Sequence, residues 1–317
     1  MSLKAAVERT IPPAVQQALQ QLAWPVWHSE QQRLRAPVRA ILPLVISFIG
    51  LAVILSTIRA QFEHPMREVV ELLGLTTVLG GSMLISSKLL DRHPLAEYGL
   101  VVDRTWLQSF VVGGLIATAV NAGTFLVALA AGWITVVDIA GGAGELPFVA
   151  AVVVTFGLTT IAAAWEEFIF RGTMLKNVGA GAGGYVPQWA AVTLALAVST
   201  GVFAFMHSSK VSSPSAYGYY LLAGLIFGCV YVLSGDLGLP MGFHAFYNFS
   251  MSVLFGLGVS QRSPELFVLN VGGPAVWVGE EGILRGVFAA IGGLLLVGYI
   301  WWQNGSLGVD DRIVRRL

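Results

Sequence analysis

Long apolar runs separated by short polar or glycine-rich stretches dominate this chain. Each run is about 20 residues, enough to cross about 30 Å of hydrocarbon, and the runs fall at 40–58, 69–87, 107–131, 148–170, 189–206, 217–234, 241–257 and 287–302. The runs are continuously apolar rather than alternating, which favours helices, because a helix satisfies its own backbone hydrogen bonds in lipid. The pattern therefore predicts an all-α fold with about eight transmembrane helices.

The composition is typical of a polytopic membrane protein. Only 11% of the residues are charged and 56% are hydrophobic, with a mean hydropathy of +0.74, whereas soluble domains carry about 25% charged residues. The 18 basic and 18 acidic residues balance, which argues against a nucleic-acid partner. A single cysteine, Cys229, excludes a disulfide framework and a multi-cysteine metal site.

Basic residues in the short flanks predict the orientation. Lysine and arginine precede the first run, connect the second and third, and close the chain, while 132–147 has none. By the positive-inside rule, both termini are expected to be cytoplasmic. Within the N-terminal segment 1–39, Val15, Leu19 and Leu22 predict a short amphipathic helix on the cytoplasmic surface.

One polar skeleton, Glu-Glu-x-x-x-Arg-Gly, occurs twice, as EEFIFRG from Glu166 and as EEGILRG from Glu280. Glu166 and Glu167 follow an unbroken apolar run, so we expect them inside the bilayer. Glu280 and Glu281 follow LNVGGPAVWVG, which predicts an interfacial loop before the last span. A carboxylate within the membrane is unfavourable by about 3 kcal/mol or more and usually serves a function. We therefore interpret the first copy as the candidate site and the second as a helix-start motif.

Helical spacing separates the two carboxylates of the first copy. Glu167 and Arg171 are four residues apart on one face, so an ion pair that keeps both in the membrane is expected. Glu166 points about 100° away and has no cation on its own helix. A desolvated carboxylate without a cation holds a proton more readily, as a general base near neutral pH requires. Glu166 is therefore the predicted chemical group, with Glu167 and Arg171 as support.

Polar residues of later runs are expected to converge on Glu166. His207 ends GVFAFMH, four residues after Phe203, and His244 and Asn248 lie four apart in HAFYN. Measured from the turns on the cytoplasmic side, the rise of a helix gives depths of about 20 Å for Glu166, about 28 Å for His207 and about 13 Å for His244. These depths agree only within a few helical turns, and His207 is the outlier.

Three motifs together resemble a known family. EEFIFR, FAFMH and HAFYN, in this order on successive predicted spans, are similar to the motifs of the CPBP family, also called the Abi family. That family comprises the CAAX prenyl proteases and bacteriocin-processing or self-immunity proteins. The resemblance covers about 148–257, and RHPLAEYGL at 92–100 is similar to a segment that often precedes this core in bacterial members.

The resemblance implies an intramembrane endopeptidase of a bacterial inner membrane that acts on a membrane-associated protein or peptide. It implies that Glu166 and His207 activate water. His244 and Asn248 would then be neutral donors to the oxyanion, with Glu167, Arg171 and Phe203 as support. A zinc ion on Glu166, His207 and His244 is the alternative, but there is no HExxH helix, and an asparagine suits an oxyanion better than zinc. We therefore expect no metal and no other cofactor.

The glycine-rich loop at 176–188 and the assigned topology further predict that substrate reaches the site from the cytoplasmic leaflet. The substrate sequence and the oligomeric state stay open.

Two other functions remain possible at this point. A proton-coupled transporter also places ionisable residues in the membrane, but it favours a spread pathway and inverted repeats, whereas here these residues cluster in spans four, five and seven. A non-catalytic immunity or binding member would keep the family fold without turnover. The predicted division is an N-terminal segment 1–39, accessory spans 40–147, a catalytic core of spans four to seven at 148–257, and a C-terminal part 258–317.

Overall fold

The structure is a computed structural model that describes residues 26–29, 31–63, 66–211, 213–258, 264–279 and 282–314. The predicted amphipathic helix around Val15, Leu19 and Leu22 lies outside these residues, as do Glu280 and Glu281.

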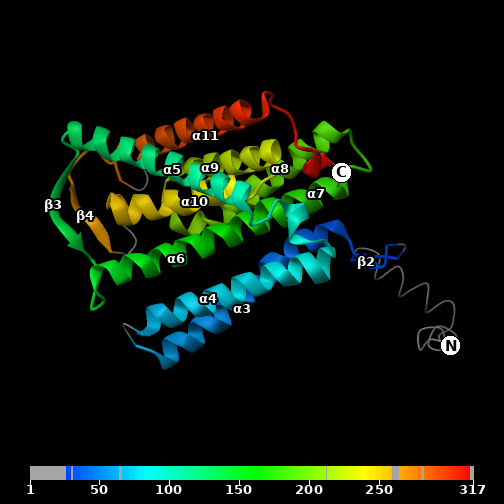
Figure 1. Cartoon of the computed structure of the whole chain (residues 1–317), viewed down its shortest axis with the longest axis horizontal. Helices are drawn as coiled ribbons and strands as arrows, with labels where there is room; N and C mark the ends of the chain where they lie inside the picture. The colour runs from blue at the N-terminus through cyan, green and yellow to red at the C-terminus, as the bar shows by residue number, and fades with distance from the viewer. Residues whose placement is uncertain are drawn as a thin grey trace.

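Helices of alternating direction lie along one common axis, so that the start of the first helix and the last short helix lie at the same end of the bundle (Figure 1). In chain order these are α3 (Ala36–Gln61), α4 (Met66–Ile85), α5 (Arg104–Ala130), α6 (Phe148–Glu167), α7 (Lys176–Ala182), α8 (Gln188–Met206), α9 (Pro214–Ser234), α10 (Gly238–Phe249), α11 (Ile283–Asn304) and α12 (Asp311–Val314). The all-α prediction is confirmed.

Seven helices in the described part of the chain are long and apolar enough to cross a membrane. They correspond to every predicted span except the seventh. The run at 241–257 is also helical, as the 12 residues of α10 and the 5 residues of a π-helical segment, η5 (Ser250–Leu254), but it is shorter than any of the seven. Eight apolar segments therefore form helices, and one of them falls short of the length of a full span.

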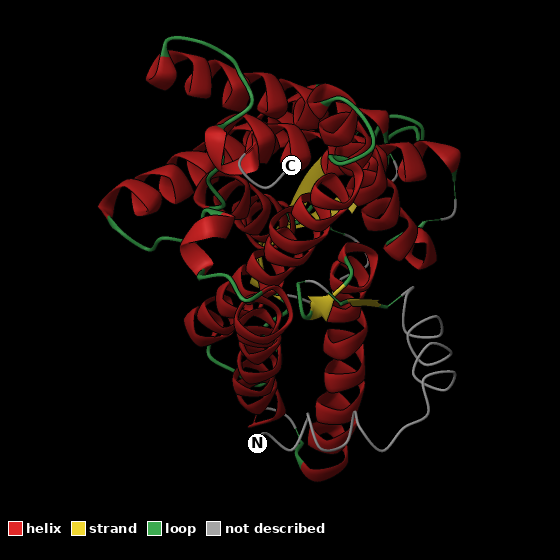
Figure 2. Cartoon of the chain, turned by 90° about the vertical axis from the view of Figure 1, so that its right-hand side faces the viewer, coloured by secondary structure: helices red, strands yellow, loops and turns green. Residues whose placement is uncertain are grey.

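Two short antiparallel ribbons interrupt the helical pattern. At the end opposite α12, β3 (Ile134–Gly141) pairs with β4 (Glu265–Val271) (Figure 1). At the other end, β1 (Trp27–His28) pairs with β2 (Arg33–Leu34), and an end-on view shows how small both ribbons are beside the helices (Figure 2). The longer ribbon was not predicted from the sequence, because strands of seven or eight residues give a weak signal beside 20-residue runs, although ITVVDIAG is rich in β-branched residues.

The helix that carries the Glu-Glu pair is continuous from Phe148 to Ala182 over 35 residues. Directly after Glu167 it widens into a π-helical segment, η3 (Phe168–Leu175), a geometry that is frequent at functional sites. Hydrogen bonds fix this helix on two sides. Trp165 Nε1 donates to Ser47 Oγ of α3 at 2.9 Å, and Ser199 Oγ of α8 donates to the Phe170 carbonyl at 2.8 Å.

Helix α10 packs closely against α5. A Cβ atom at Gly242 would overlap the Phe110 carbonyl, and one at Gly113 would overlap the Leu239 carbonyl, so both glycines are needed for the close approach of the two backbones. Asn121 Nδ2 of α5 also donates to the Tyr247 carbonyl at 2.8 Å. Helix α5 lies outside the predicted core at 148–257, yet it positions one of the helices of that core. The predicted domain boundaries stay a prediction.

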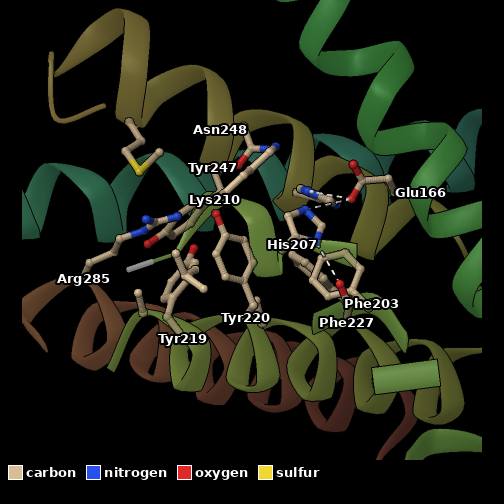
Figure 3. Close-up of a pocket in the computed structure, with 15 residues that line it drawn as sticks. Glu166, Phe203, His207, Lys210, Tyr219, Tyr220, Phe227, Tyr247, Asn248 and Arg285 are labelled. Carbon is tan, nitrogen blue, oxygen red and sulfur yellow. Dashed lines mark hydrogen bonds and ion pairs between the residues drawn. The ribbon is translucent and has the colours of Figure 1, made fainter. Parts of the chain in front are cut away.

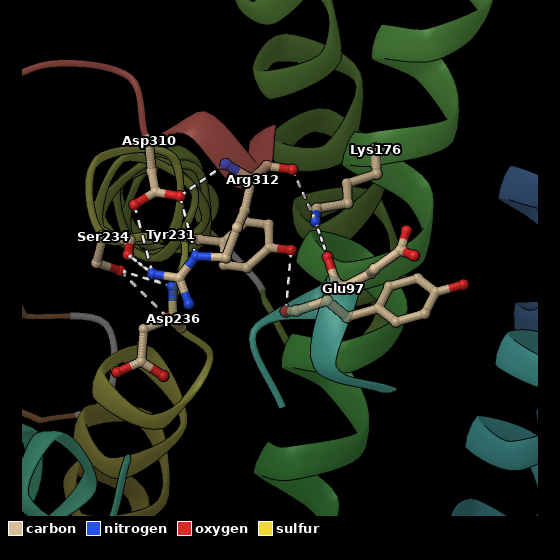
Figure 4. Close-up of polar contacts among 8 residues, drawn as sticks. Glu97, Lys176, Tyr231, Ser234, Asp236, Asp310 and Arg312 are labelled. Carbon is tan, nitrogen blue, oxygen red and sulfur yellow. Dashed lines mark hydrogen bonds and ion pairs between the residues drawn. The ribbon is translucent and has the colours of Figure 1, made fainter. Parts of the chain in front are cut away.

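Polar contacts hold the C-terminal segment against the end of the bundle where α3 begins (Figure 4). Arg312 Nη2 donates to the Ser234 carbonyl at 2.8 Å and its Nε pairs with Asp310 at 3.0 Å. Lys176 Nζ donates to the backbone carbonyls of Glu97 and Arg312. The end of the chain is thereby joined to the end of the long helix that begins at Phe148.

The α5–α10 contact yields a stability prediction. Gly242→Ala forces the two backbones apart, so we expect it to lower the free energy of unfolding by about 1–3 kcal/mol, measured by thermal denaturation in detergent. The matched control is Gly298→Ala in α11, where an added Cβ meets open space and helix propensity gains about 1 kcal/mol. Equal stability of the two variants would contradict the close packing.

Candidate active site

Three segments bring the four predicted site residues together around one pocket. Glu166 lies at the end of α6, His207 directly follows α8, and His244 and Asn248 lie on α10. All four line a small pocket of about 110 Å³, together with residues from α9 and from the start of α11 (Figure 3). The expected convergence in space is therefore observed. The depths calculated from the helical rise had placed His207 about 8 Å deeper in the membrane than Glu166.

Both imidazole rings face the same carboxylate oxygen. His207 Nε2 and His244 Nε2 each lie 3.9 Å from Glu166 Oε2, and Oε2 is buried without a hydrogen-bond partner among the described residues. A separation of 3.9 Å is too long for a direct hydrogen bond. It leaves space for one water to contact the oxygen and a ring nitrogen at the same time.

Contacts at the opposite ring nitrogens assign the tautomers. His207 Nδ1 lies 2.8 Å from the Phe203 carbonyl, which only accepts, so Nδ1 carries the proton and Nε2 is an acceptor. His244 Nδ1 lies 2.8 Å from Glu167 Oε1 and is a donor in the same way. A neutral His244 thus presents an acceptor to the pocket. With this tautomer, only the imidazolium form donates from Nε2, and the role of His244 as a donor to an oxyanion stays a prediction.

The predicted Glu167–Arg171 pair is present and completely buried. Arg171 Nη1 lies 3.1 Å from Glu167 Oε1, and both side chains are 0% exposed. Arg171 Nη2 also donates to the Gly224 carbonyl of α9 at 3.2 Å. Glu167 Oε1 therefore accepts from a guanidinium and from His244 at once, as an ionised carboxylate does. This pair connects the Glu-Glu helix to α9 and α10.

Aromatic rings surround these polar groups. The Arg171 guanidinium lies 4.5 Å from the Phe203 ring centre and 5.0 Å from that of Phe227, close enough for cation–π attraction. The His244 ring stacks on Phe227 with centroids 4.6 Å apart, and the His207 ring contacts Phe203 at 4.5 Å. Phe203 therefore contacts both the supporting cation and a site imidazole.

The donor atoms match a zinc site in kind but not in spacing. Two imidazole nitrogens and one carboxylate oxygen form a His₂Glu set, and zinc–ligand bonds of about 2.0–2.1 Å place tetrahedral ligands roughly 3.3 Å apart. Here the carboxylate oxygen lies 3.9 Å from each nitrogen. No group of three or more His, Cys, Asp or Glu within the described ranges is placed to hold a metal ion. The residues as arranged do not fit zinc, and the expected absence of a cofactor stays a prediction.

Sequence reasoning missed the wall of the pocket opposite Glu166. This wall contains Lys210, Tyr219, Tyr220, Tyr247 and Arg285 (Figure 3). Arg285 is the arginine of EEGILRG, the copy interpreted as a helix-start motif. It does lie at the start of α11, and its guanidinium is 3.7 Å from the Tyr219 ring centre. The repeat of the skeleton was a usable signal, but no spacing rule could show that Arg285 faces the pocket of the first copy.

The pocket lining includes Lys210 and Val211. These residues follow the C-terminal end of α8 and lie in the connection to α9. The lining thus includes the connection that follows α8. The predicted entry of substrate from the cytoplasmic leaflet stays a prediction.

The buried pair yields a second stability prediction. Glu167→Gln leaves the Arg171 charge uncompensated, so we expect a loss of about 3–5 kcal/mol in the free energy of unfolding. The double variant Glu167→Gln/Arg171→Met removes both charges and should recover most of that loss. As a control, Glu71→Gln breaks the pair with Arg59, whose side chain is 62% exposed, and should change stability by less than about 1 kcal/mol. If Glu167→Gln unfolds at the wild-type temperature, the pair does not stabilise the core.

Comparison with known proteins shows which family the central segment of the chain is similar to. No curated protein and no solved structure matches the chain. Residues 148–250 match the family model described as type II CAAX prenyl endopeptidase Rce1-like, and this segment includes Glu166, His207, His244 and Asn248. Through this segment, which is less than half of the chain, the protein is similar to the type II CAAX prenyl endopeptidases of the Rce1-like family.

Proposed function

We propose that this protein is an intramembrane endopeptidase that hydrolyses a peptide bond of a membrane-associated protein or peptide. The observation that carries the proposal is the placement of two imidazole nitrogens, each 3.9 Å from a buried oxygen of Glu166 that lacks a hydrogen-bond partner among the described residues. A water between these groups would meet a general base inside a pocket largely surrounded by aromatic rings.

Counting protons supports a charged His244. Glu166 Oε2 and the two Nε2 atoms are three acceptors, whereas one water offers two O–H donors. A third proton is therefore needed for three hydrogen bonds. In this proposal His244 Nε2 is the third donor, because the other ring nitrogen, Nδ1, already donates to the Glu167 carboxylate. His207 has only a backbone carbonyl at the same place.

The reaction follows from these positions. Glu166 takes a proton from the water as the water oxygen bonds to the substrate carbonyl carbon, with His207 orienting the water through Nε2. The carbonyl oxygen becomes an oxyanion that accepts from the His244 imidazolium and from the Asn248 amide. As the C–N bond breaks, the proton held by Glu166 passes to the leaving nitrogen, which gives a carboxylic acid and an amine. Glu167, Arg171 and Phe203 hold the rings and charges in place.

The gathering of ionisable groups favours a peptidase over a transporter. Glu166, His207 and His244 lie within one pocket of about 110 Å³, rather than along a path through the bundle. A non-catalytic family member would bind in the same place without turnover. The membrane is the expected location, with the bacterial inner membrane and cytoplasmic termini as part of the proposal. No nucleic-acid partner is expected.

Substitution of the site tests the proposal. Glu166→Gln, His207→Ala and His244→Ala should each lower cleavage by at least about 100-fold, because each removes a group that contacts the reacting atoms. Comparative proteomics of membrane peptides, wild type against Glu166→Gln, identifies the substrate, and turnover is then measured with purified protein. Glu71→Gln in α4 should retain full turnover. An active Glu166→Gln variant would end the proposal.

Metal removal gives an independent prediction. Because the Glu166 and histidine atoms are spaced for water rather than for zinc, we expect turnover to survive dialysis against a chelator. Elemental analysis of the purified protein should then find well under one zinc per chain. Loss of turnover on dialysis, with recovery only on adding metal, would instead make Glu166, His207 and His244 ligands.

A further inference from the structure

A second cleft, much larger than the pocket at Glu166, lies between α3 and α8. Its volume is about 1250 Å³, compared with about 110 Å³ for the pocket at Glu166. The helix that begins at Phe148 forms its floor through residues of η3 and α7, and residues of β1 and β2 line one end. Hydrogen bonds fix α3 and α8 to this helix from two sides, so the two helices flank the cleft. The proposed reaction does not use it.

Apolar side chains line most of the cleft. Helix α8 contributes five of them, Leu194, Val198, Val202, Phe205 and Met206. From the first to the last, these residues cover about 18 Å along the helix axis. The floor near the end of α7 is made of alanine and glycine residues of the GAGAGG stretch, whose small side chains leave space between α3 and α8. This shape and lining suit a long hydrocarbon chain, which gains free energy in proportion to the apolar area it buries.

Positive charge collects at the end of the cleft where α3 begins. Arg33 and Arg35 both line this end, and no aspartate or glutamate is among the described residues that line the cleft. Arg33 Nε donates to the neutral amide oxygen of Gln31 at 2.8 Å. The carboxylate of Asp91, which follows α4, is paired with Arg39 at 2.7 Å. The lining of this end is therefore basic and complements an anion.

The basic end lies at the level of a membrane surface. Helix α3 is long and apolar enough to cross a membrane, and the two arginines directly precede its start at Ala36. Figure 1 shows β2, the start of α3 and α7 at the same end of the bundle. Tyr185 lines the cleft there and is 88% exposed, and Trp189 in the first turn of α8 is 72% exposed. Such aromatic residues are enriched at the level of the lipid head groups.

We propose that this cleft binds one anionic phospholipid, with its phosphate at Arg33 and Arg35 and an acyl chain along α8 toward Met206. Guanidinium groups match phosphate oxygens in geometry, and basic pockets between transmembrane helices bind anionic head groups. A free phosphate would use only the basic end and leave the apolar length of the cleft unfilled, so a lipid fits the whole cleft. The inference does not depend on the peptidase function.

Lipid binding to the purified full-length protein in detergent tests the inference, with native mass spectrometry as the readout. We expect one phosphatidylglycerol retained per chain, and at least about tenfold weaker retention of zwitterionic phosphatidylcholine. Arg33→Gln/Arg35→Gln should weaken phosphatidylglycerol binding about 30-fold, as for two arginines near a membrane surface. The matched control is Arg59→Gln/Arg67→Gln, which removes the same charge where α3 ends and α4 begins and should bind as the wild type does. Equal retention of both lipids, or unchanged binding in Arg33→Gln/Arg35→Gln, would overturn the proposal.

A second variant tests the apolar part without touching the arginines. Val198→Trp fills the cleft beside α8 and should weaken phosphatidylglycerol binding at least about tenfold, with the lipid-free melting temperature of the wild type. Glycerol 3-phosphate, which has the anion without the chains, should not displace the lipid. Normal lipid binding by Val198→Trp would contradict the assigned path of the acyl chain. Displacement by glycerol 3-phosphate would show a site for a free anion instead.

Photo-crosslinking identifies the occupant directly. p-Benzoylphenylalanine at Phe205, which lines the cleft and is 67% exposed, should give an adduct with the mass of phosphatidylglycerol when one lipid is present per chain. The same group at Leu294 of α11, which is 73% exposed and lies outside the cleft lining, should give none. An adduct at Phe205 with residues 1–25 or with a second copy of the chain would make that segment or copy the occupant and overturn the proposal.

Discussion

The buried contact of Glu167 with Arg171 and His244 is the interaction on which the site depends. One carboxylate oxygen accepts from a guanidinium at 3.1 Å and from an imidazole at 2.8 Å, and the two ionic side chains are 0% exposed. Charges in such a place are tolerated only when an opposite charge lies next to them. The contact therefore requires α9 and α10 to lie against the Glu-Glu helix, and these are the helices that supply most of the pocket wall.

This contact also decides the chemistry of His244. With Nδ1 held by Glu167, the other nitrogen faces Glu166, so the neutral ring is an acceptor and the charged ring is a donor. Support and reactivity are thus physically linked, because the residue that neutralises Arg171 also orients the ring next to the base.

The second copy of the Glu-Glu-x-x-x-Arg-Gly skeleton shows what a sequence motif can predict and what it cannot. Its arginine, Arg285, comes from the start of α11 and lies in the pocket of the first copy. The sequence contains both copies, and their apolar surroundings favoured the one with Glu166 as the candidate site. The same ranking excluded Arg285 from the candidate site, because a local sequence does not show which side chains line a pocket between helices.

Hydrophobic runs determined the helical fold and nearly every span, because the length and apolarity that a membrane requires are local properties of the chain. Spacing by four residues determined the Glu167–Arg171 pair, because both lie on one helix face. The order of three motifs was enough to indicate the family. The depth of His207 was not determined, since a rise of 1.5 Å per residue says nothing of where neighbouring helices begin or how they tilt. Only the tertiary structure brought His207 and His244 to the same oxygen of Glu166 and placed Arg285 in their pocket, because these depend on contacts between helices distant in sequence.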